Sequence, residues 1–89
     1  MAASAGAVFT ILSVTIVDAR GLACPLPLTM AKRRMADLNA GDTLVVLATD
    51  PEAPIDLGAW AAVEGHAFSS RALEGWSEYS LVKASTSGR

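Results

Sequence analysis

The 89-residue sequence contains a single cysteine, Cys24, and few charged or aromatic residues. One cysteine cannot form a disulfide within the chain, which fits a reducing compartment, and we therefore expect a cytoplasmic protein. The sequence also lacks a Cys-x-x-Cys pair. A thioredoxin-like oxidoreductase is therefore not expected, because its reaction requires a second, resolving thiol.

Basic residues are scarce as well. Seven Lys and Arg stand against nine Asp and Glu, and the formal net charge is −2. The longest basic run is Lys32-Arg33-Arg34, so the charge pattern of a nucleic-acid-binding protein is missing and no direct nucleic-acid partner is expected. No apolar run is long enough to span a membrane, and the apolar stretch 1–17 has no basic start typical of a signal peptide.

What remains is a largely apolar chain, with 52% hydrophobic and 18% charged residues. This composition and length predict one folded domain over residues 1–89. We expect an ordered core over about 8–84, with flexible tails at 1–7 and 85–89.

Hydrophobic periodicity predicts the first half of the fold. Leu12, Val14 and Ile16 alternate with Ser13, Thr15 and Val17, which predicts a strand whose Leu12, Val14 and Ile16 face lies in the core. A helix is expected from about Pro25 to Leu38, followed by a turn at 39–42. The helix residues expected to face inward are Leu28, Ala31, Met35 and Leu38.

The second half is predicted in the same way. The apolar run 43–49 indicates a strand that is covered on both faces or central, and that lies parallel to the first strand through a right-handed crossover. A second helix is expected to begin near Pro54 and to stop at Gly65. Strands 66–73 and 77–84 form a hairpin around Glu74-Gly75. The residues expected to form the buried stripe of the second helix are Ile55, Ala59, Trp60 and Val63.

The predicted order is βαβαββ. It indicates an α/β (α+β) two-layer sandwich, with both helices on one face of a mixed four-stranded sheet.

Cys24 is the main candidate for chemistry. Pro25 and Pro27 mark a helix start, because proline is tolerated in the first turn, where backbone N–H groups have no intrahelical acceptor. A thiol at the amino end of a helix is near the positive end of the helix dipole, which favours the thiolate and makes Cys24 a candidate nucleophile. A lone cysteine is more often a small buried apolar residue. The flanking prolines favour the nucleophile here.

The outer face of the first helix provides a candidate docking surface. Leu26, Met30 and Arg33 fall on the side opposite the predicted core face, close to Cys24, and both apolar side chains are expected to be exposed. Scattered apolar residues are also ordinary on protein surfaces. Only the neighbouring thiol favours the docking interpretation.

Other residues with possible chemistry are better explained structurally. His66 could pair with Cys24 as in a cysteine hydrolase, but no glycine-rich oxyanion loop accompanies them. Asp18, Asp50 and Asp56 fit turns and helix starts better than a metal cluster, and no Cys/His spacing suits zinc. We therefore expect neither a metal nor a cofactor.

The segment Asp18-Ala19-Arg20-Gly21-Leu22-Ala23-Cys24-Pro25-Leu26-Pro27 resembles the TusA/SirA family of sulfur-carrier proteins, and so do Gly41-Asp42, Asp50-Pro51, Asp56, Trp60 and Gly65-His66 further on. The resemblance implies two helices on a four-stranded sheet. It also implies that Cys24 is catalytic, supported by Gly21, Pro25 and Pro27 of the motif. Cys24 would accept sulfane sulfur as a persulfide from a cysteine desulfurase or rhodanese and pass it to an acceptor protein.

Family members serve tRNA thiolation, cofactor biosynthesis or sulfur metabolism. In tRNA-thiolation members the residue before the cysteine is commonly basic and the one between the prolines acidic, whereas this chain has Ala23 and Leu26. These changes alter the surface that a partner meets. The alternative to a sulfur carrier is a non-catalytic interaction or regulatory module of the same fold.

Overall fold

The computed structural model describes residues 14–84. The elements follow the predicted order βαβαββ and are β1 (Val14–Ala19), α2 (Leu26–Met35), β2 (Thr43–Ala48), α3 (Ala53–Glu64), β3 (Ala67–Leu73) and β4 (Trp76–Val82). The expected tails at 1–7 and 85–89, and the start of the expected core at 8–13, lie outside these residues.

The four strands form one mixed sheet in the order β1-β2-β4-β3. β1 runs parallel to β2, whereas β4 pairs antiparallel with both β2 and β3. β2 is therefore central in the sheet, one of the two environments predicted for its apolar run. Its side chains alternate between buried and half-buried, so β2 is not covered equally on both faces.

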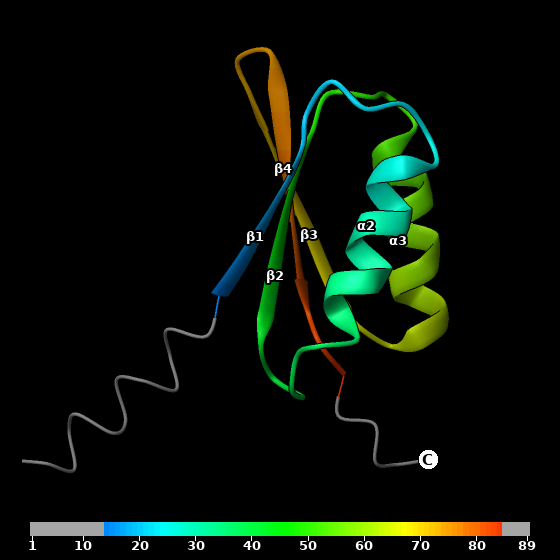
Figure 1. The fold of residues 1–89 in the computed structure, drawn as a ribbon, viewed down its shortest axis with the longest axis vertical. Helices are drawn as coiled ribbons and strands as arrows, with labels where there is room; N and C mark the ends of the chain where they lie inside the picture. The colour runs from blue at the N-terminus through cyan, green and yellow to red at the C-terminus, as the bar shows by residue number, and fades with distance from the viewer. Residues whose placement is uncertain (1–13, 85–89) are drawn as a thin grey trace, which may run out of the picture.

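Helices α2 and α3 lie side by side on one face of the sheet (Figure 1), as predicted. On α2, Ala31 and Met35 are buried and Leu28 packs against the core, as does Leu38 just after the helix. The helix ends at Met35, three residues earlier than predicted. The hydrogen-bond pattern changes there, because the Asp37 and Leu38 amides donate to carbonyls three residues back instead of four, each at 3.0 Å.

The buried face of β1 differs from the prediction. Val14 and Ile16 are 50% and 62% exposed, whereas Val17 and Ala19 are buried beneath the helices. Both faces of this strand carry apolar side chains, so alternation alone does not say which face the helices cover. The small Ala19 is on the covered side, where a crossing helix can approach closely.

The buried stripe predicted for α3 is wrong at three of its four residues. Ile55 and Val63 are 64% and 81% exposed and Ala59 is exposed, whereas Trp60 is half-buried and packs against the core. The helix instead buries Ala53, Leu57 and Ala61. Almost every residue of α3 is apolar, so several stripes with helical spacing fit its sequence equally well.

The connections agree with the prediction. Gly65 ends α3 in the left-handed conformation, with φ +83°, and the His66 amide donates to the Ala61 carbonyl at 2.9 Å. The β3–β4 hairpin turns at Glu74-Gly75. Lys83, just after β4, donates from Nζ to the carbonyls of Met35 and Leu38 and thereby ties the end of the sheet to the end of α2.

Candidate functional site

Cys24 lies in the connection between β1 and α2, two residues before the helix, and is exposed. Pro27 is fully buried in the first turn of α2, whereas Pro25 is exposed. Gly21 has φ +83°, a conformation that favours glycine, and its amide donates to Thr49 Oγ1 at 2.9 Å. This bond ties the Cys24 loop to the end of β2 and presents the thiol at the surface.

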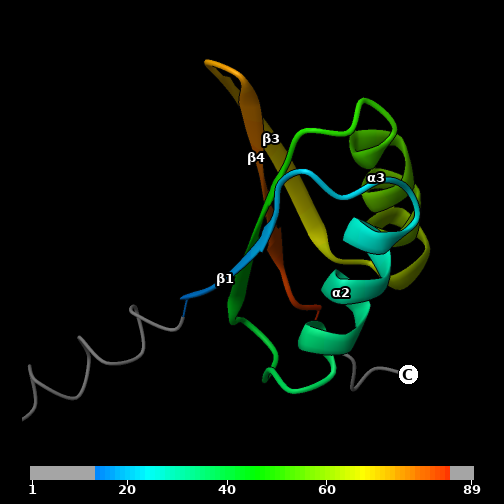
Figure 2. The same ribbon diagram turned by 45° about the horizontal axis from the view of Figure 1, so that its top comes forward.

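Two carboxylates meet at Cys24, one from the β2–α3 connection and one from α3. Its backbone amide donates to Asp50 Oδ2, and its thiol donates to Asp56 Oδ2 at 2.8 Å. Asp50 follows β2 and also accepts the Glu52 amide, while Asp56 lies in the first turn of α3. Figures 1 and 2 both show the two connections side by side at one end of the sheet.

The acidic surroundings overturn the expected stabilisation of the thiolate. The hydrogen bond to Asp56 raises the pKa of the Cys24 thiol to about 11, and burial together with the charges of Asp56, Asp50 and Glu52 acts in the same direction. The prolines weaken the opposing effect of the helix, because Pro25 and Pro27 have no N–H to offer. The Leu26 amide is taken by the Ala23 carbonyl at 2.9 Å.

A third predicted turn carboxylate, Asp18, is held elsewhere. Two of its oxygens accept hydrogen bonds from the Arg20 guanidinium at 2.9 and 2.8 Å, which lower the pKa of Asp18 to about 2. The same guanidinium lies 4.9 Å from the ring centre of Trp76. Asp18 therefore does not join the other carboxylates at Cys24. Within residues 14–84, no group of three His, Cys, Asp or Glu side chains could hold a metal ion.

The three predicted docking residues have different environments. Leu26 and Arg33 are exposed on α2. Met30 is half-buried and packs against the core, contrary to the expectation that it would be exposed like Leu26. The apolar surface next to Cys24 is therefore smaller than predicted.

His66 is too far from Cys24 to act as its base. The thiol contacts the first turn of α3, whereas His66 follows the other end of this helix, about 15 Å away at 1.5 Å per residue. His66 Nδ1 accepts the Ala84 amide at 2.9 Å, and its ring meets Trp60 edge-on at 5.1 Å. Burial lowers the pKa of His66. These contacts fit the structural interpretation of His66.

Sequence reasoning assigned Asp50 and Asp56 only to a turn and a helix start. One observation could have connected them with Cys24. The carboxyl ends of neighbouring parallel strands meet at the same edge of a sheet, so the connections that follow β1 and β2 had to be adjacent.

Within residues 14–84, neither helix has the length and hydrophobicity needed to cross a membrane.

Comparison with known proteins identifies the family. The family described as "Sulfurtransferase TusA" matches residues 15–82. The sulfur carrier protein TusA of Allochromatium vinosum is 38% identical over 69 residues, covering 78% of this chain and 91% of that protein. The Bacillus subtilis protein YrkF is 47% identical over 60 residues, but the chain covers only 32% of its length.

A solved structure agrees. The SirA-like protein from Desulfitobacterium hafniense matches with a TM-score of 0.72 and 27% identity, covering 80% of this chain and 97% of that one. Fold, sequence and relatives are therefore consistent. The chain belongs to the TusA family of sulfur carriers, which receive sulfur from a donor and pass it to an acceptor.

Proposed function

We propose that this chain carries sulfur as a persulfide on Cys24. The observation that supports this most strongly is an exposed thiol, the only one in the chain, on a loop fixed by Gly21 and buried Pro27. An exposed thiol can meet a donor protein directly. With no second cysteine in the chain, the persulfide cannot be resolved internally to a disulfide with release of sulfide.

The transfer step conserves atoms and electrons. The sulfur of Cys24 attacks the terminal sulfur of a persulfide on the donor, a new S–S bond forms, and the donor's S–S bond breaks. The donor cysteine leaves as a thiolate and takes up the proton that Cys24 loses. The same step in reverse, with an acceptor thiolate as the attacking group, unloads the carrier.

We propose that Asp56 controls when Cys24 loses its proton in this step. In the resting chain its carboxylate accepts a hydrogen bond from the thiol, with 2.8 Å between Sγ and Oδ2, so Cys24 is a poor nucleophile until that bond is broken. A cationic group of the donor that pairs with Asp56 or Glu52 would lower the pKa of the thiol on docking. Reactivity would then depend on the partner.

The partners we propose are a cysteine desulfurase or rhodanese-type donor and a downstream acceptor protein. Exposed Leu26 and Arg33, with half-buried Met30 between them, would form part of the docking surface on α2. A cytoplasmic location remains our prediction, supported by the single cysteine. The competing function is a binding module that docks through α2 without carrying sulfur.

Intact-mass measurement distinguishes these two functions. After incubation with a cysteine desulfurase and L-cysteine, the wild-type chain should gain the mass of one sulfur atom and Cys24→Ala should gain none. A Glu64→Gln variant, changed on exposed surface at the end of α3 far from Asp56, is the matched control and should load like the wild type. If wild type and Cys24→Ala gain the same mass, or neither gains any while both bind the desulfurase, the binding module is favoured.

A further inference from the structure

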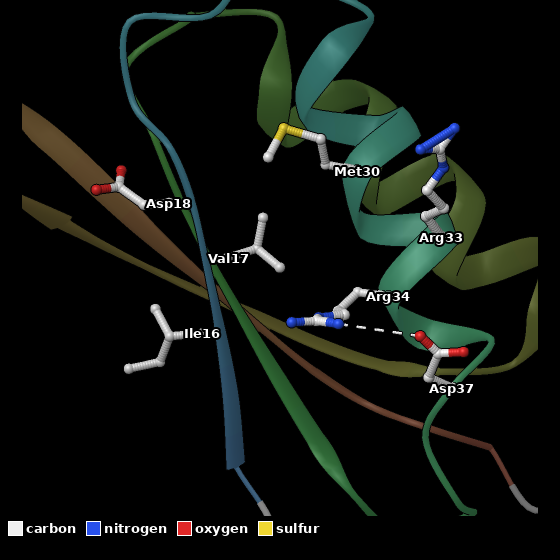
Figure 3. A pocket seen from close by; sticks show the side chains of 7 residues that line it. All are labelled: Ile16, Val17, Asp18, Met30, Arg33, Arg34 and Asp37. Carbon is white, nitrogen blue, oxygen red and sulfur yellow. Dashed lines mark ion pairs between the residues drawn. The ribbon is translucent and has the colours of Figure 1, made fainter.

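A groove runs between β1 and α2, outside the site around Cys24. Its volume is about 420 Å³, and Figure 3 shows the side chains that line it. Val17 and Met30 point toward each other across the groove, and Arg34 extends from α2 toward β1. The full lining is Ile16, Val17, Asp18, Met30, Arg33, Arg34 and Asp37.

Among residues 14–84, the side of the groove formed by β1 is an edge of the sheet. β1 pairs with β2 along all six residues and has no strand on its other side in the described sheet. In a parallel strand, alternate residues direct N–H and C=O groups to the outer edge, where they can pair with another strand. β1 contains no proline, no lysine and no interruption of its register, and Asp18, its one charged residue, is paired with Arg20.

The charges of the groove favour an acidic occupant. Arg34 is 3.9 Å from Asp37 in a widely exposed pair, which neutralises it only weakly. Arg33 makes no ion pair within residues 14–84, and the charge of Asp18 is taken by Arg20. A carboxylate on the occupant would complement Arg33 and Arg34. Residues 1–13, which directly precede β1, contain no Asp or Glu, so we look for that carboxylate in a partner protein.

We propose that an extended segment of a partner protein docks here as a strand added to the outer edge of β1. One of its apolar side chains fills the space between Val17 and Met30, and a carboxylate two residues away on the same face pairs with Arg34, with Arg33 at the rim. This inference goes beyond the proposed function, because it holds whether or not Cys24 carries sulfur.

A blocked hexapeptide tests the proposal. One face of the probe carries valine, glutamate and valine, and the other face carries threonine. Titrated into the isotope-labelled chain, it should shift the NMR signals of β1 and of the groove side of α2. Arg34→Glu should weaken its affinity at least about tenfold. Lys32→Glu makes the same charge change on the other side of α2, in a hollow lined by Trp60 and Glu64. It should change the affinity for the peptide less than about twofold.

Two further probes separate strand addition from simple charge attraction. Replacing the glutamate of the peptide with lysine should abolish binding. Two peptides, each N-methylated at one of the two alternating sets of positions, should differ in affinity. Only one of these sets of N–H groups faces β1, and methylating that set should weaken binding. Loading of Cys24 by a small sulfur donor should be the same in Arg34→Glu and wild type, so failure of this proposal is distinguishable from failure of the persulfide.

Several outcomes would overturn the proposal. These are no binding at millimolar peptide, equal binding of the lysine peptide, equal loss in Lys32→Glu, or shifts confined to β3 and α3. Slow hydrogen exchange at the outer amides of β1 in the free chain would also overturn it. In that case the edge is already occupied by a second copy or by the chain's own segment.

Discussion

Cys24 is controlled by its neighbours more than by its position at a helix start. The helix dipole contributes at most about 1 kcal/mol at an exposed site, and two of the nearest amides are missing because the residues are prolines. Opposing this, the Asp56 carboxylate accepts a hydrogen bond from the thiol at 2.8 Å, and two more acidic side chains, Asp50 and Glu52, lie close by. The acidic side chains dominate, and the thiol rests protonated.

Removing the carboxylate should release the thiol. In Asp56→Asn the pKa of Cys24 should fall from about 11 toward its ordinary value of 9.0, because the negative charge that opposes the thiolate is gone. The thiolate fraction at pH 8 rises, but its nucleophilicity falls with pKa, so alkylation should be about tenfold faster. The alkylation rate measured against pH gives both quantities.

Asp37→Asn serves as the control and should keep the wild-type profile. An Asp56→Asn profile with an unchanged midpoint would show that Asp56 does not set the state of the thiol.

At the scale of elements, the packing of α3 is the clearest correction to the sequence analysis. Leu57→Ala should reduce the free energy of unfolding by about 2–5 kcal/mol, since Leu57 is fully buried against the sheet. Ile55→Ala, two residues away on the exposed face, should change it by less than about 0.5 kcal/mol. Urea unfolding of both variants would decide the face. Equal losses would contradict this packing.

Lys83 connects two elements and gives a second test. Its Nζ donates at 3.0 and 2.6 Å to the carbonyls of Met35 and Leu38, at the negative end of α2. Lys83→Met should therefore lower the free energy of unfolding by about 1–2 kcal/mol, while Lys83→Arg should restore part of the loss. Equal stability of Lys83→Met and wild type in urea unfolding would show that water replaces the ammonium group at no cost.

Element type and order followed from the sequence because periodicity, prolines and glycines agreed. Gly65 and Glu74-Gly75 ended or turned the chain where expected, and the parallel β1–β2 pairing followed from the intervening helix. The covered faces of β1 and α3 did not follow, because each has apolar side chains on more than one face. The contacts of Cys24 with Asp50 and Asp56 depend on residues 26 and 32 positions away, which local patterns do not report.

Across the whole molecule, the side chains that stabilise the fold are separate from the thiol that we propose carries sulfur. The core consists of side chains between the helices and the sheet, including Leu44, Val46, Leu57 and Leu81, whereas Cys24 is exposed at one end. Cys24→Ala should therefore change the free energy of unfolding by less than about 0.5 kcal/mol and abolish sulfur loading. Loss of cooperative thermal unfolding in this variant would show that Cys24 is structural.

In the proposed cycle, Cys24 takes up one sulfur from a donor and gives it to an acceptor. Peptide-level mass spectrometry tests this most directly, on the chain loaded by a cysteine desulfurase, separated from it, and then treated with cyanide as a small sulfur acceptor. The peptide that contains Cys24 should carry one extra sulfur and should lose it on cyanide treatment, with formation of an equal amount of thiocyanate. No extra sulfur on that peptide, or sulfur that cyanide does not remove, would contradict it.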